Sequence, residues 1–135
     1  MNTVQFAEVA YKMSQKQLVT AVVTGRRVQD VANSEFMMLV CQQLFLNPDA
    51  DVVHFCATQP GFKYLTAFAL VVMRFQQRLF DYEIFSNALK DPRKIIIGQT
   101  LSTIDQLAYR LLTEPSFGGA AFPWRIDPKK IRITK

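Results

Sequence analysis

Polar and apolar residues alternate with helical spacing along most of the chain. The pattern predicts a first helical stretch over residues 3–25 and a second helix from Ser34 to the turn signal Asn47-Pro48. A third apolar face continues from Ile97 to Leu111, with successive spacings of four and three residues. These segments predict a mainly α-helical protein.

The most hydrophobic helical pattern covers residues 62–89. Its polar positions fall on one stripe that includes Arg74, Arg78 and Asp81, whereas the other positions are largely apolar. A helix that is apolar around most of its circumference belongs in the centre of a bundle or in an interface. At 28 residues it would be about 42 Å long, which is as long as a domain of this size is wide. It therefore either breaks near Asp81, leaving a central helix near 62–80, or reaches a neighbouring molecule.

Three segments leave their secondary structure open. Residues 51–57 are a short apolar run that suits either a strand or a helix. Asp91-Pro92 is a suitable helix start, but residues 94–97 can instead be extended, followed by a helix from about 103 to 113. Residues 130–134 alternate as a strand does. The predicted fold is thus a compact bundle of four to five helices around a hydrophobic central helix, with a small β element in one of these segments.

Length and composition limit the class of protein. The 135 residues suit one domain, and a hydrophobic content of 50% supports a sizeable core. The N-terminal residues lack a signal-peptide pattern, and the longest near-apolar run, residues 64–73, is too short to span a membrane. We therefore expect a cytoplasmic protein that does not insert in membranes.

The net charge of +5 is concentrated near the C-terminus. Five of the 16 basic residues follow Pro115, against the single acidic residue Asp127. This asymmetry divides the chain into a helical domain, residues 1–115, and a basic-aromatic arm, residues 116–135. The arm either packs back on the domain or is free, and a free arm would be removable without unfolding the domain. Its aromatic and basic residues combine stacking with phosphate neutralisation, and equally suit a docking peptide: Phe117, Phe122, Trp124, Arg125, Lys129, Lys130 and Arg132.

Four further arginines are candidates for contacts with an anion: Arg26, Arg27, Arg74 and Arg78. Arg74 and Arg78 are four residues apart and would lie side by side on the polar stripe. The simpler interpretation is a solvated stripe, for which replacing Arg74 by alanine would change stability by no more than about 0.5 kcal/mol.

The sequence shows no arrangement typical of catalysis. Its one histidine excludes a two-histidine metal site, and Cys41 and Cys56 lack a CxxC spacing. If residues 52–56 were extended, His54 and Cys56 would share a face as a thiol and its base. Burial of both thiols in the core is the favoured interpretation. Phosphate-binding glycine motifs are also absent, so we expect no enzyme activity, no cofactor and no metal.

These observations favour a small non-catalytic binding or assembly module that acts through protein–protein contacts. The length of the hydrophobic helix further predicts self-association into a homo-oligomer. The alternative is a nucleic-acid-binding protein that uses the basic C-terminal arm.

Overall fold

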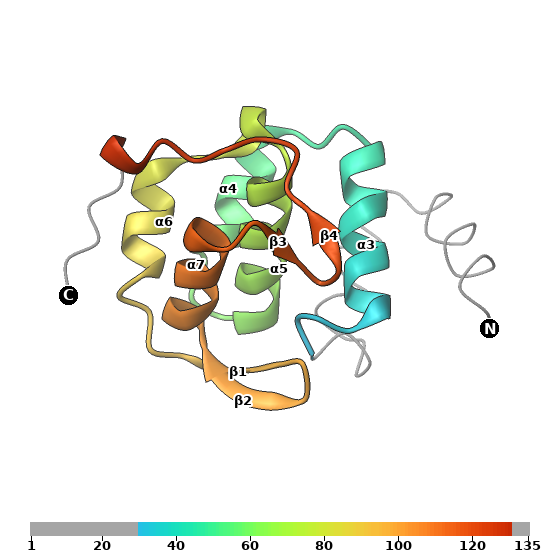
Figure 1. Ribbon diagram of the computed structural model, residues 1–135. Coiled ribbons are helices and arrows are strands. Elements are labelled where there is room, and N and C mark those ends of the chain that lie inside the picture. The colour runs from blue at the N-terminus through green and yellow to red at the C-terminus, as the bar shows by residue number, and fades with distance from the viewer. Residues whose placement is uncertain (1–29, 131–135) are drawn as a thin grey trace.

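The structure, a computed structural model, describes residues 30–130, so the expected helical stretch over 3–25 lies outside it. Within that range the fold is mainly helical, with five α-helices and two small antiparallel hairpins (Figure 1). The helices are α3 (Ser34–Phe45), α4 (Ala50–Thr58), α5 (Lys63–Phe75), α6 (Tyr82–Ala88) and α7 (Ile104–Thr113). The hairpins pair β1 (Lys94–Ile97) with β2 (Thr100–Thr103), and β3 (Ser116–Phe117) with β4 (Ala120–Ala121). Two 3₁₀ turns complete the fold, η2 (Gln77–Leu79) and η3 (Pro128–Lys130).

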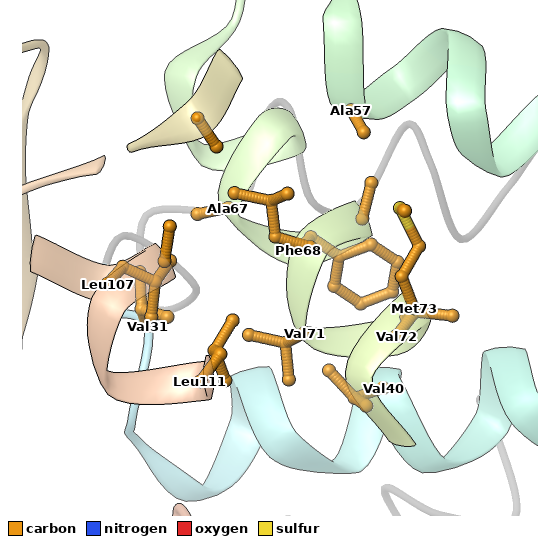
Figure 2. Close-up of a cluster of buried hydrophobic side chains, with 14 of the residues drawn as sticks. Val31, Val40, Ala57, Ala67, Phe68, Val71, Val72, Met73, Leu107 and Leu111 are labelled. Atoms are coloured by element: carbon orange, nitrogen blue, oxygen red, sulfur yellow. The ribbon is translucent and has the colours of Figure 1, made fainter. Parts of the chain in front are cut away.

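Helix α5 forms the centre of the bundle, which confirms the predicted hydrophobic central helix. Its residues Leu65 to Arg74 are all buried, and the other helices cover it on several sides. Figure 2 shows Val71 of α5 together with Val40 of α3 and Leu111 of α7 in one apolar cluster. The described helices include none that is long and apolar enough to cross a membrane.

The hydrophobic pattern breaks, which is the first of its two predicted alternatives, but the central helix ends before residue 80. The backbone turns to an extended conformation at Gln76, so α5 ends at Phe75. A new helix, α6, begins after Asp81, whose carboxylate accepts a hydrogen bond from the backbone N–H of Ile84 at 3.0 Å. Other parts of the same chain cover the apolar surface around α5. The argument for self-association from a 28-residue helix therefore no longer applies.

Side-chain caps mark the N-terminal starts of the first two described helices. Asn33 accepts a hydrogen bond from the N–H of Phe36 at 2.8 Å and starts α3, which ends before Asn47-Pro48 as predicted. Asp49 accepts from the N–H of Asp51 at 2.8 Å and starts α4. The open segment 51–57 is therefore helical.

The small β element lies at residues 94–97, one of its three predicted places. Asp91 does not cap a helix there, because its carboxylate pairs with Arg93 at 2.7 Å and the chain continues into β1. Gly98 and Gln99 both have positive φ and form the turn to β2. Asp30 fixes this turn, since its two carboxylate oxygens accept from the N–H groups of Gly98 and Gln99 at 2.7 and 2.8 Å. Of residues 130–134, only Lys130 is described, and it lies in η3.

Residues 116–127 pack on the helices, which is the first of the two predicted states of the arm. The β3–β4 turn holds Gly118 so close to α3 that an added Cβ would lie 2.6 Å from Sδ of Met37. The N–H of Phe122 then bonds to the carbonyl of Pro115 at 3.1 Å. From there the segment crosses the bundle towards α6 (Figure 1).

Candidate functional site

The aromatic residues of the C-terminal segment contact the helical body. Phe117 is 2% exposed, and its ring lies 5.2 Å from the guanidinium of Arg110 on α7. The ring of Phe122 lies 4.9 Å from that of Phe75 at the end of α5. Phe117 is therefore a core residue, and Phe122 lies against α5 instead of standing free as a docking anchor.

Arg74 and Trp124 form a reciprocal clasp between α5 and the C-terminal segment. The indole N–H of Trp124 donates to the carbonyl of Arg74 at 2.7 Å, and the guanidinium of Arg74 donates to the carbonyl of Trp124 at 3.1 Å. The same guanidinium donates to the carbonyl of Leu111 at 2.7 Å. It lies 3.9 Å from the ring centre of Phe122 and 4.8 Å from that of Trp124, so it stacks with two aromatic rings.

The expectation that Arg74 lies on a solvated stripe is wrong. The residue is only 4% exposed, and burial lowers the pKa of its guanidinium to about 10. It still carries its proton at neutral pH, and backbone carbonyls and aromatic faces take up its charge. Arg74 therefore joins three parts of the fold, α5, α7 and the C-terminal segment, and is closed to an anion from solution.

The other predicted cations lie in different surroundings. Arg78 is exposed, and its guanidinium bonds to the side-chain oxygen of Asn47 at 2.9 Å and to the carbonyl of Pro48 at 3.0 Å, in the loop between α3 and α4. Arg125, Lys129 and Lys130 are exposed. The ammonium of Lys130 lies 5.7 Å from the ring centre of Tyr82. Three predicted cations lie outside the described residues: Arg26, Arg27 and Arg132.

Neither sulfur forms a catalytic arrangement with His54. On helix α4 the two-residue spacing directs His54 and Cys56 to different faces, and Nε2 of His54 lies 2.7 Å from the carbonyl of Leu79. Cys41 is exposed, which contradicts the expectation that both thiols are buried. Residues 30–130 contain no cluster of three potential metal ligands.

The two thiols are expected to react at very different rates. Burial raises the pKa of Cys56, so both its access and its thiolate fraction are low, whereas Cys41 is open to solvent on α3. Labelling the native protein with iodoacetamide at pH 8 and mapping by mass spectrometry should modify Cys41 first. Equal labelling of both thiols before denaturation would contradict the burial of Cys56.

The exposed apolar residues of α3 and α4 are the feature that sequence reasoning missed. We call the set the docking face, and its residues with their exposed fractions are Phe45 (74%), Val52 (41%) and Phe55 (70%). Val52 and Phe55 are three residues apart and so lie on one side of α4. Two exposed acidic side chains, Asp49 and Asp51, lie at the start of α4, close in sequence to Val52.

A shallow depression adjoins the docking face, between α3, α4 and the central helix. Its lining includes Val52 on α4, Gln43 on α3 and Phe68 on α5. The space amounts to about 10 Å³, which is the room of about one water molecule, so it holds no small-molecule substrate. The surface is better suited to binding an apolar partner than to holding a substrate for catalysis.

The comparisons with known proteins identify a family. The PRP38 family pattern matches residues 2–134, which is nearly the whole chain. No curated protein and no solved structure gives a significant match. The chain belongs to the PRP38 family, a family of splicing factors.

Proposed function

We propose that this PRP38-family chain is a non-catalytic assembly module of the splicing machinery, and that its docking face holds a protein partner. The observation that carries the proposal is the exposure of Phe45, Val52 and Phe55 on two consecutive helices, where they make up half of the exposed large apolar residues found within residues 30–130. Single exposed apolar residues are common on proteins, but aromatic residues gathered on one region are typical of interfaces.

The energetics of the docking face favour a protein as its occupant. Covering apolar surface contributes about 25 cal/mol per Å², and aromatic side chains supply most of the affinity at many interfaces. Asp49 and Asp51 at the start of α4 add negative charge beside the face. A partner segment with an apolar side and basic flanking residues matches this combination, since complementary charge speeds association.

The alternative function, nucleic-acid binding through the C-terminal arm, receives less support. Of its aromatic residues, Phe117 is buried, and Phe122 and Trp124 are half-buried against the helices, so each offers little ring surface for stacking with a base. The arm still exposes Arg125, Lys129 and Lys130, which can attract phosphates by their charge alone. Membership of a splicing-factor family favours the nucleus over the cytoplasm that the sequence suggests.

Replacing Phe55 by aspartate tests the docking face. The side chain is exposed, so the variant should fold with an unchanged melting temperature, while a charge in a desolvated interface should lower partner affinity about tenfold or more. The measurement is quantitative affinity purification from nuclear extract, with nuclease added so that RNA does not bridge the proteins.

Tyr109 provides the matched control, because it is 45% exposed on α7 and outside the docking face. The Tyr109→Asp variant should retain the splicing proteins that Phe55→Asp loses. If both variants recover these splicing proteins equally and are equally stable, the proposed role of the docking face is wrong.

A further inference from the structure

We propose that a cavity beside the α4–α5 and α6–β1 loops binds one unpaired nucleotide of a single-stranded nucleic acid, with the base in the cavity and the phosphates on surrounding lysines. This site is separate from the docking face and from the C-terminal arm, so it goes beyond the function proposed above.

The cavity has the size of a planar heterocycle. Its volume is about 190 Å³, several times the roughly 30 Å³ that one water occupies in the liquid. Its wall combines small apolar groups with polar ones, and its residues come from four parts of the chain: Ala57 and Thr58 on α4, Thr66 on α5, Ile84, Asn87 and Ala88 on α6, and Asp91 and Arg93 in the following loop. A flat apolar ring with a polar edge fits such a lining.

The charged pair in the wall is internally neutralised. Arg93 donates to both carboxylate oxygens of Asp91, the shortest contact being 2.7 Å. Further N–H groups of Arg93 donate to the carbonyl of Pro60 at 3.1 Å and to the hydroxyl of Thr66 at 3.2 Å. These bonds fix the wall and cancel its charge, so the cavity favours a neutral occupant.

Asn87 supplies the groups that can recognise a base edge. Its side chain is exposed on α6, and no hydrogen bond to it is found among the described residues. A carboxamide presents a donor and an acceptor together, which is the combination that pairs with the edges of nucleobases.

Residues close in sequence to the lining of the cavity supply positive charge and an aromatic ring. Lys63 begins α5, and Lys90 and Lys94 flank Asp91 and Arg93 in sequence; all three are exposed, and none forms an ion pair within residues 30–130. Phe62 precedes Lys63 and is 54% exposed, while the side-chain amide of Gln59 holds its carbonyl at 2.7 Å. Lysines for phosphates and an aromatic ring for a neighbouring base are the usual components of a single-strand site.

Fluorescence anisotropy with a labelled 12-nucleotide RNA of mixed sequence, and with the DNA of the same sequence, tests the proposal on the full chain. The Lys90→Ala/Lys94→Ala variant should weaken binding and flatten the slope of log affinity against log salt by about 1.4, since each single-strand phosphate contact contributes about 0.7. Asn87→Ala should weaken binding about tenfold with no change in slope. Phe62→Ala should weaken it about fivefold or more. Tighter binding of the RNA would show that the site contacts the 2′-hydroxyl. Equal binding of the two would support a site for single-stranded RNA and DNA alike.

The control is Lys129→Ala/Lys130→Ala, which removes the same charge from the C-terminal segment. Equal losses in the two double variants would overturn the proposal, because binding would then follow net charge alone. An unchanged affinity in Asn87→Ala would also overturn it, as would competition by poly-glutamate at matched charge, which would indicate an acidic peptide instead. The docking-face variant Phe55→Asp should bind the RNA normally, so the two proposals fail separately.

Discussion

Removing residues 116–135 is expected to unfold the helical body, contrary to the expectation for a free arm. The truncation exposes the apolar surfaces of α5 and α7 and removes the rings of Phe117, Phe122 and Trp124. Fully burying one such side chain contributes about 1.5 to 3 kcal/mol, so the three, of which Phe117 is buried and the other two are half-buried, contribute at most about 4.5 to 9 kcal/mol. That is comparable with the whole stability of a typical domain, about 5 to 15 kcal/mol.

Circular dichroism of the truncated and full chains measures this effect. The truncated chain should show no cooperative thermal transition near that of the full chain, and a weak near-ultraviolet signal. The Lys129→Ala/Lys130→Ala variant, which alters only exposed side chains of the segment, should melt as the full chain does. A truncated chain that melts within a few degrees of the full one would show that the packed segment adds little to the fold.

Replacing Arg74 by alanine is expected to lower the free energy of unfolding by about 3 kcal/mol or more. The change leaves the carbonyls of Leu111 and Trp124 without their charged donor, and each such bond is worth about 1.5 to 3 kcal/mol. It also removes the cation from between two aromatic rings. For a chain of this size the melting temperature should fall by roughly 10 °C.

Trp124 is the only tryptophan, so its fluorescence reports on the clasp directly. Urea unfolding followed at this residue should show the lower midpoint of Arg74→Ala, and a red-shifted emission in the folded variant. Arg74→Lys should recover little, because an ammonium lacks the planar fork that bonds and stacks at once. Arg78→Ala, at an exposed arginine four residues further on, should cost less than about 1 kcal/mol. Similar losses at the two arginines would contradict the clasp.

Local patterns in the sequence identify most of the helices. The apolar spacing places α3 and the central helix, and the caps of α3 and α4 are local interactions, since Asn33 and Asp49 accept from N–H groups three and two residues away. The choice between a helix and a strand at 94–97 depends on Asp30, which binds the β1–β2 turn from 68 residues away. An interaction between residues so far apart in the sequence cannot be recognised from the pattern of neighbouring residues.

The same limit explains why the interpretation of Arg74 and the C-terminal segment failed. The four-residue spacing of Arg74 and Arg78 gives their relation on an ideal helix, but not that α5 ends between them. The partner of Arg74, Trp124, lies 50 residues along the chain. Aromatic and basic residues in a short segment rich in glycine and proline have the composition of a free arm, and only tertiary contacts distinguish the packed state.

The exposure of the docking face could not be predicted from the sequence for a different reason. Apolar periodicity does not distinguish the hydrophobic residues of a helix that are buried from those that face solvent, so it does not single out Phe45 or Phe55. Helix α4 has nine residues and buries only Val53, Cys56 and Ala57, which leaves its other side to solvent. Which side faces outward follows from how α4 lies against α5.

Photo-crosslinking from the docking face tests the central claim most directly. Benzoylphenylalanine in place of Phe55, in the otherwise unaltered chain, should crosslink in nuclear extract to the splicing protein that Phe55→Asp fails to recover. The same group in place of Tyr109 on α7 should leave that protein unlinked. Crosslinks to this protein from position 109 and none from position 55, in a chain of normal stability, would contradict the account.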